Sequence, residues 1–297
     1  MSKASRLLVA TVALFGLAGA ACGSDSKDTA ATTVTTATAA ATTTPAPTTV
    51  APTTVAPTTV APTTVAPTTV PAASGDVVVF AASSLTEAFT EMGTAFTTAN
   101  PKANVKFNFA GSGDLVTQIG QGAPADLFVS ADDSNMKKLS DAGEAAGSPV
   151  AIAKNTFQII VEKGNPKGIS GLADLAKSDV VVVLCAATVP CGKGAATILK
   201  NANVTVTPKS LEDKVKGVVT KVTTGEADAG IVFVTDVKAA GGKAAGVEIP
   251  AGVNVISNYP IVITKEATNT AGAQAFMDFV VSSPGQAILA KYGFLAP

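Results

Sequence analysis

The sequence contains no histidine and no tryptophan, and only 5% of its 297 residues are aromatic. The absence of histidine excludes Ser-His-Asp and Cys-His catalysis and most zinc sites. The absence of tryptophan argues against a platform for stacking sugars. The formal net charge is −1, so the chain has no basic surplus for nucleic acid or for an anionic membrane surface. We therefore expect no nucleic-acid partner.

Residues 1–22 have the pattern of a bacterial lipoprotein signal peptide. Two basic residues precede the apolar stretch 7–21, which is too short and too rich in alanine and glycine for a comfortable membrane span. The segment A-A-C-G at 20–23 resembles a lipobox, with Gly19 where leucine is usual, and this resemblance implies lipidation of Cys22. An ordinary signal peptide is the alternative. We expect an exported protein that is lipid-anchored at the outer face of the cell membrane.

Residues 23–75 contain almost nothing that could form a core. The unit A-P-T-T-V repeats in tandem from Ala46 to Val70, and its regular prolines block both helix and sheet. The segment is predicted to be a disordered, extended stalk, partly polyproline II. Recognition of the repeat by a partner is the alternative, and O-glycosylation of its threonines stays open.

The remaining residues, 76–297, alternate short apolar runs with amphipathic segments. The apolar runs predict strands at 77–80, 105–109, 126–130, 157–161, 180–184, 231–234 and 259–263. Helical spacing predicts helices at 85–96, 115–119, 136–142, 195–200, 214–224 and 271–281. This alternation indicates an α/β protein with largely parallel sheets. In such sheets ligands bind at the carboxyl ends of the strands.

Strand-to-helix turns of one kind recur along this part of the chain, with small or hydroxyl residues and glycine. They are A-A-S-S-L at 81–85, A-G-S-G-D at 110–114, V-P-C-G-K-G at 189–194 and S-L-E-D-K-V-K-G at 210–217. Ser84 with Glu87, and Ser210 with Asp213, have capping-box spacing. Each turn alone could be a simple cap or glycine turn. Together they predict an anion site built from helix N-termini and neutral donors. Lys193 is interpreted as a solvated lysine at a helix start, with ligand contact as the alternative.

Cys185 precedes the third of these turns, and Cys191 lies within it. A metal site would lack further ligands, because there is no histidine and the remaining cysteine is Cys22. A redox pair would more usually have the spacing C-x-x-C. In an exported protein we interpret the pair as a Cys185–Cys191 disulfide that holds the turn, with two reduced buried thiols as the alternative. We expect no metal ion and no cofactor.

Several segments of the folded part resemble molybdate-binding proteins of ABC importers. They are V-F-A-A-S-S-L-T-E-A-F, F-A-G-S-G-D-L-V-T-Q-I, G-A-P-A-D-L-F-V-S-A-D and A-K-Y-G-F, and the likeness runs from about Val77 to Phe294. The resemblance implies the α/β, type II periplasmic-binding-protein fold. In that fold two α/β lobes are joined by two crossover segments, with the ligand in the cleft. We place the first lobe at 76–152 plus 257–297 and the second at 153–256.

In that family two serine hydroxyls, two backbone N–H groups and a tyrosine hydroxyl contact the oxyanion. The resemblance implies that Ser84 and Ser112 supply the serine hydroxyls. It implies that Cys191 and Val215 supply the N–H groups. The tyrosine position corresponds to Phe233 in the segment G-I-V-F, so one hydroxyl is missing. Ser83 or a water is expected to replace it.

The sequence thus predicts a monomeric, lipid-anchored solute-binding protein that is not an enzyme. It would capture molybdate, and tungstate by the same chemistry, and deliver it to an ABC permease. A binder of sulfate, thiosulfate or phosphonate on the same fold is the nearest alternative. A phosphoester enzyme with a Ser or Cys nucleophile lacks a histidine base. An adhesive or scaffold lipoprotein would leave the matched turns without a purpose.

Overall fold

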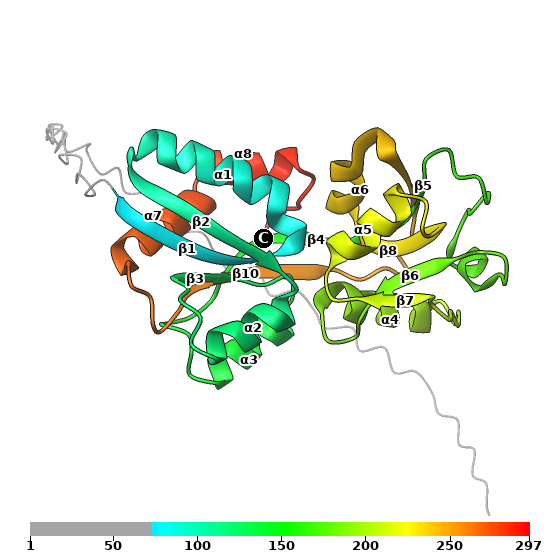
Figure 1. Cartoon of the computed structure of the whole chain (residues 1–297), viewed down its shortest axis with the longest axis horizontal. Helices are drawn as coiled ribbons and strands as arrows, with labels where there is room; N and C mark the ends of the chain where they lie inside the picture. Colours follow the sequence, from blue (N-terminus) through cyan, green and yellow to red (C-terminus); the bar gives the residue numbers. More distant parts are fainter. Residues whose placement is uncertain (1–72) are drawn as a thin grey trace, which may run out of the picture. The chain divides into compact units, whose positions relative to one another are not determined.

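The computed structural model describes residues 73–297 (Figure 1). The chain divides into two units, Met1–Val65 and Ala66–Pro297, and every described residue lies in the second. The predicted signal peptide with Cys22, and nearly all of the predicted stalk, lie outside the described residues. Ser74 and Gly75 are different, because they begin strand β1 (Ser74–Ala82) and pair with β2. The prediction that the stalk extends to residue 75 is therefore wrong: β2 offers backbone partners beyond the apolar run.

Two five-stranded sheets organise the described residues. The first has the order β2-β1-β3-β10-β4, and consists of β1 with β2 (Lys102–Ala110), β3 (Leu127–Val129), β4 (Val150–Asn155) and β10 (Ser257–Ile263). The second has the order β7-β6-β8-β5-β9, and consists of β5 (Phe157–Glu162), β6 (Val182–Cys185), β7 (Ser210–Glu212), β8 (Ala229–Phe233) and β9 (Ala244–Glu248).

The chain crosses between the sheets at the β4–β5 and β9–β10 connections. We call residues 73–155 plus 257–297 the first lobe and residues 156–256 the second lobe. The boundary predicted at 152/153 falls inside β4, which stays in the first sheet until Asn155.

The sheets are mixed rather than largely parallel. Strand β1 is parallel to β2 and β3, and β6 is parallel to β7 and β8. Strands β10 and β5 run antiparallel to both of their neighbours. Each of these two strands enters its sheet from the other lobe, so it begins at the edge where the parallel strands end. The apolar runs indicated buried strands but carried no information on direction.

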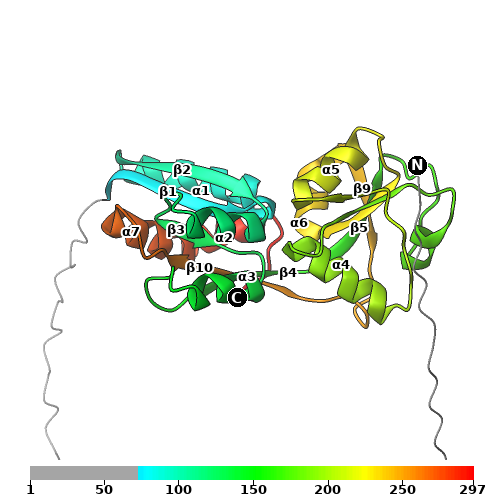
Figure 2. The same cartoon turned by 60° about the horizontal axis from the view of Figure 1, so that its bottom comes forward.

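Helices cover both faces of each sheet (Figure 2). On the first sheet, α1 (Thr86–Ala99), α7 (Thr270–Val281) and α8 (Ser283–Lys291) lie on one side, and α2 (Ser112–Gly120) and α3 (Asp133–Asp141) on the other. On the second, α5 (Val215–Thr223) and α6 (Val234–Ala240) lie opposite α4 (Pro190–Asn201). Three short 3₁₀ helices are η1 (Ser83–Leu85), η2 (Leu172–Ala176) and η3 (Gly241–Lys243). Among residues 73–297, no helix has the length and hydropathy needed to cross a membrane.

Both faces of β1 are buried, which explains its continuous apolar sequence. Val77 and Val79 lie in the main core cluster, beside helix α1. Phe80 points to the other face, where it packs with Leu115 of α2 and Met136 of α3. With both faces covered, the carboxyl ends of the parallel strands and the turns that follow them remain to form a site.

Candidate ligand-binding site

A small cavity lies between the lobes, at the carboxyl ends of the parallel strands. Its lining consists of Ala82, Ser83, Ser84, Ala110, Gly111, Ser112 and Ala131 from the first lobe, and Val189, Pro190, Cys191, Lys214, Val215 and Phe233 from the second. The volume open to the centre of a water-sized sphere is ≈ 10 Å³, which is about enough for a single water molecule. The cavity therefore suits a compact ion rather than a sugar or a peptide.

The structure brings into this one cavity the four residues that the resemblance implied as contacts, together with Phe233, which lacks the hydroxyl, and the substitute donor Ser83. They are Ser83, Ser84, Ser112, Cys191, Val215 and Phe233. The lining also includes two residues that the sequence did not single out as contacts and that bear on the site, Ala131 and Lys214. Lys214 directly precedes Val215 inside the fourth predicted turn, and Ala131 lies two residues after the end of β3, outside the four turns. Lys214 is the only titratable residue of the lining.

The α-helices that begin at the cavity have no side-chain cap. Helices α2, α4 and α5 begin at Ser112, Pro190 and Val215, and no side chain accepts a hydrogen bond from their first-turn N–H groups. The same holds for η1, which leads into α1, and for α6, whose N-cap is Phe233.

The α-helices that begin elsewhere are capped. Asp132, Asn269 and Ser282 accept first-turn N–H groups of α3, α7 and α8. First-turn N–H groups need partners, and these can come from a ligand. The contrast between the two sets of helices points to a ligand with several acceptor atoms in the cavity.

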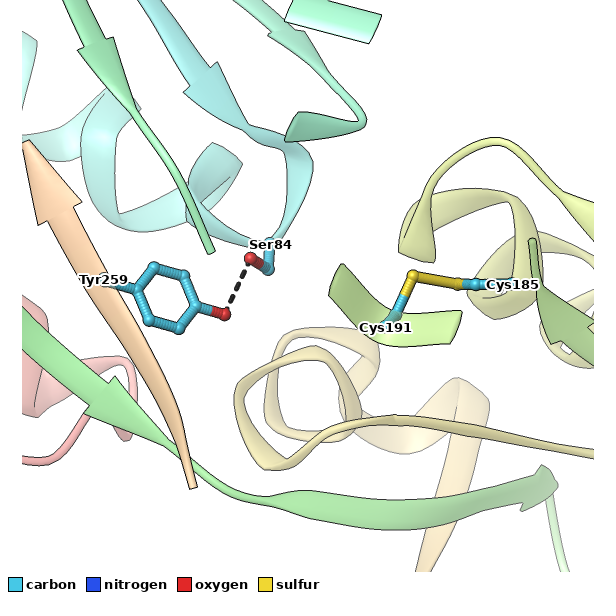
Figure 3. Close-up of a disulfide and its surroundings, with 4 residues drawn as sticks. All are labelled: Ser84, Cys185, Cys191 and Tyr259. Carbon is cyan, nitrogen blue, oxygen red and sulfur yellow. Dashed lines mark hydrogen bonds between the residues drawn. A yellow bond between two sulfur atoms is a disulfide. The ribbon is translucent and has the colours of Figure 1, made fainter. Parts of the chain in front are cut away.

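The two predicted capping boxes are wrong. Ser84 lies inside η1, and its hydroxyl lies 2.9 Å from the hydroxyl of Tyr259 (Figure 3). Ser210 lies in β7, where its Oγ donates to Glu212 at 2.6 Å and accepts from Lys221. In each case the chain continues as strand or 3₁₀ turn beyond the serine, so the serine is not at the N-cap.

Ser112 is held as a hydrogen-bond donor toward the cavity. Its Oγ accepts the backbone N–H of Ala131 at 3.1 Å. Because an N–H can only donate, the hydroxyl proton of Ser112 stays available. Ser112 is almost completely buried and lines the cavity, so a ligand in the cavity is within reach of that proton.

Phe233 presents an aromatic ring without a hydroxyl to the cavity. The ring packs at 4.5 Å between centroids against Phe157 and at 5.9 Å against Tyr259. Tyr259 is fully buried, and burial raises its pKa far above the ordinary value, so the phenol is neutral. Sequence analysis missed Tyr259, because nothing in the strand S-N-Y-P-I-V-I distinguishes this residue from a core aromatic.

Cys185 and Cys191 form a disulfide (Figure 3), so this prediction is confirmed. The bridge joins the end of β6 to the first turn of α4. The turn is tightly packed, because a Cβ on Gly192 would collide with the carbonyl oxygen of Ala186. Pro190 has no N–H, so the N–H of Cys191 is the first donor of this helix.

Lys193 does not line the cavity, and its ammonium group has partners in the other lobe. Its Nζ donates to Asp132 Oδ2 at 2.9 Å and to Ser134 Oγ at 2.5 Å. Both partners belong to the first lobe, so Lys193 joins the lobes beside the cavity. The sequence did not predict this ion pair between the lobes, because the acceptors are distant in sequence.

Comparison with known proteins gives the family. Residues 77–295 match the model of the family described as bacterial extracellular solute-binding protein. The chain is 42% identical over 221 residues to the molybdate-binding protein ModA of Mycobacterium tuberculosis, covering 74% of this chain and 85% of ModA. It is 29% identical over 231 residues to YvgL of Bacillus subtilis, named as a substrate-binding lipoprotein of an ABC transporter, covering 74% of this chain and 86% of YvgL.

A solved structure has the same fold. The periplasmic molybdate-binding protein of Azotobacter vinelandii matches with a TM-score of 0.65 at 22% identity, covering 74% of this chain and 99% of that chain. The predicted fold is confirmed: two α/β lobes, two crossovers and a cavity between them. The chain belongs to the ModA-like family of bacterial extracellular solute-binding proteins.

Proposed function

We propose that this chain captures molybdate between its lobes and delivers it to the permease of an ABC transporter. The observation that carries the proposal is the set of uncapped helix N-termini around one small cavity. Family membership supports a role in solute transport, and the name of the mycobacterial relative supports molybdate as the solute.

Neutral donors are sufficient for this task. We assign the anion contacts to the hydroxyls of Ser84 and Ser112 and the N–H groups of Cys191 and Val215. Ser83 or a water takes the place of the hydroxyl that Phe233 lacks. Hydrogen bonds to a charged partner contribute about 1.5–3 kcal/mol each. Several of them support sub-micromolar binding after the costs of association.

The choice among oxyanions depends on size. Tungstate has the same charge and shape as molybdate, so we expect it to bind about as well. Sulfate has shorter bonds, and donors fixed on helix ends cannot follow it inward. A binder of sulfate, thiosulfate or phosphonate is the alternative within the same class.

The N-terminal region would hold the protein at the membrane. We propose that Cys22 is lipidated and that residues 23–72 space the folded unit from the outer face of the membrane. The likeness to YvgL, named as a lipoprotein, supports this arrangement. We further propose that the protein is a monomer and needs no cofactor.

An enzymatic role is disfavoured by the partners of the two serines. Ser112 Oγ is contacted by the N–H of Ala131 and Ser84 Oγ by the phenol of Tyr259. Neither partner is a general base, and the sequence has no histidine. A serine nucleophile needs such a base.

Calorimetry on residues 66–297 tests the proposal directly. We expect a sub-micromolar Kd for molybdate and tungstate, and a Kd for sulfate at least about a hundredfold higher. Ser112→Ala should weaken molybdate binding about tenfold to a hundredfold. Ser283→Ala, an exposed serine at the start of α8, is the matched control and should bind as the parent does. Heat with sulfate alone would reject molybdate as the solute.

A further inference from the structure

We propose that Tyr259 is a positioning residue that directs the hydroxyl proton of Ser84 into the cavity. The inference rests on the proposed function, because it concerns how an oxyanion is held. Tyr259 does not itself line the cavity. Its effect on the ligand would pass through Ser84.

The inferred relay is a chain of hydrogen bonds from Asn155 through Tyr259 to Ser84. The contacts of Asn155 fix the direction of its first hydrogen bond. Its Oδ1 accepts the N–H of Thr156 at 3.0 Å, so its Nδ2 faces the other way. That Nδ2 donates to Thr235 Oγ1 at 2.8 Å and, over a longer 3.4 Å, to the hydroxyl of Tyr259. The side-chain amide nitrogen has only protons to offer, so Tyr259 is the acceptor of this contact.

The phenol can then donate in one direction only. Its oxygen lies 2.9 Å from Ser84 Oγ (Figure 3). Of its two contacts, Asn155 Nδ2 cannot accept, which leaves Ser84 Oγ as the acceptor. Because Tyr259 is fully buried, bulk water does not compete. With its oxygen occupied, Ser84 keeps its own proton for the cavity that it lines.

The hydroxyl of Ser112, the other serine of the site, is oriented in the same way: its oxygen accepts and its proton stays free to donate. Ser112 Oγ accepts the N–H of Ala131, and a backbone N–H can only donate. Ser257 Oγ, two residues before Tyr259 in β10, donates to the carbonyl oxygen of Ala131 and holds that residue in place. Strand β10 therefore supports both serines, and both hydroxyls are preset to donate to a ligand that only accepts.

The test is Tyr259→Phe, which removes only the hydroxyl. The ring that packs against Phe233 and Phe294, at 5.9 and 5.2 Å between centroids, is kept. We expect the Kd for molybdate to rise about tenfold, as for one lost hydrogen bond to a charged group. Tyr292→Phe is the matched control, because that hydroxyl donates to Glu91 at 2.8 Å, away from the cavity. Its Kd should match that of the parent chain.

A double-mutant cycle with Ser84→Ala separates the relay from a merely structural role. If Tyr259 acts through Ser84, Tyr259→Phe should change the Kd less than about twofold in the Ser84→Ala background. The same tenfold loss in both backgrounds, or no loss in the parent chain, overturns the inference. Failure of the parent chain to bind molybdate would instead reject the proposed function. Should the parent chain bind sulfate, the same cycle run with sulfate decides the role of Tyr259.

Discussion

Lys216 Nζ lies 2.8 Å from Glu87 Oε2 across the cleft, and so joins α5 of the second lobe to α1 of the first. The same ammonium lies 3.1 Å from the buried carboxylate of Asp236 in its own lobe. Burial alone would lower the pKa of Lys216, but Asp236 and Glu87 raise it above its ordinary value. With the Lys193–Asp132 pair at 2.9 Å, this contact bridges the lobes in the arrangement seen here.

Glu87→Gln should loosen the closed arrangement. The change removes the charge of the inter-lobe partner and leaves the Lys216–Asp236 pair intact. Partly exposed ion pairs contribute up to about 1 kcal/mol, so we expect molybdate release to become about threefold to fivefold faster. Stopped-flow displacement by excess tungstate measures the release rate.

Glu91→Gln is the control for this experiment. Glu91 lies on the same helix, but its partner Lys291, at 2.6 Å, belongs to the same lobe. Release from Glu91→Gln should match that from the parent chain. Equal release rates for the two variants would show that the Lys216–Glu87 pair does not hold the lobes together.

Gly111→Ala should oppose closure by a steric route. A Cβ at Gly111 would collide with the carbonyl oxygen of Asp213 and lie 2.8 Å from Val189 Cγ1, both in the second lobe. The backbone of Gly111, with φ −63° and ψ 137°, is open to alanine. We therefore expect little change in thermal stability without ligand, and a Kd for molybdate at least about tenfold higher.

Gly120→Ala is the matched control for Gly111→Ala. Gly111 directly precedes α2 and Gly120 ends it, and a Cβ on Gly120 would meet no heavy atom within 4 Å. Its Kd should equal that of the parent chain. If Gly111→Ala also binds as the parent does, the lobes can bind the ion without the close approach seen here.

Loss of the Cys185–Cys191 bridge should cost stability more than affinity. The loop that it closes is short, and its effect on the unfolded chain corresponds to about 2 kcal/mol. We expect Cys185→Ala/Cys191→Ala to lower the free energy of unfolding by that amount in urea titrations. Binding should weaken only about threefold, because the packing of Gly192 against Ala186 still holds the turn. A loss of binding above about a hundredfold would show that the bridge itself positions the N–H of residue 191.

The cavity could be found from sequence because each of its turns is local. Ser84, Ser112 and Cys191 lie in short segments whose glycines, prolines and hydroxyl residues mark a strand-to-helix turn. Tyr259 could not be found in this way. Its partner Ser84 is 175 positions away, and an aromatic residue in an apolar strand gives no sign of which hydroxyl it contacts.

Other features of the structure that the sequence did not predict also lack a local sequence signal. Strands β7 and β9 are short and only half-buried, so they lack the apolar run that marked the central strands. The direction of β10 depends on where the chain re-enters the first sheet, which composition does not encode. Lys193 and Lys216 find their carboxylates only after the lobes meet, 61 and 129 positions away.

Phe233→Tyr should strengthen binding. Phe233 lines the cavity at the position where the family resemblance implies a tyrosine hydroxyl. A hydroxyl there would add one donor, and we expect the Kd for molybdate to fall about fivefold to tenfold in calorimetry. Phe279→Tyr, on a half-buried ring of α7, adds the same group outside the lining and is the control. A higher Kd for Phe233→Tyr would mean that the cavity has no room for the added hydroxyl oxygen beside the ion.

Binding should be independent of pH from about pH 6 to about pH 9, because the assigned contacts are serine hydroxyls and backbone N–H groups, which do not titrate in this range. The sequence has no histidine. The raised pKa of Tyr259 keeps the phenol neutral beyond its ordinary value of 10.0. The raised pKa of Lys216 means that its contribution is complete below the ordinary 10.5 and is lost only as the pH rises through the raised value. Calorimetry across this range should give Kd values within about twofold of one another, whereas a tenfold trend would reveal a titrating contact that the neutral-donor site does not contain.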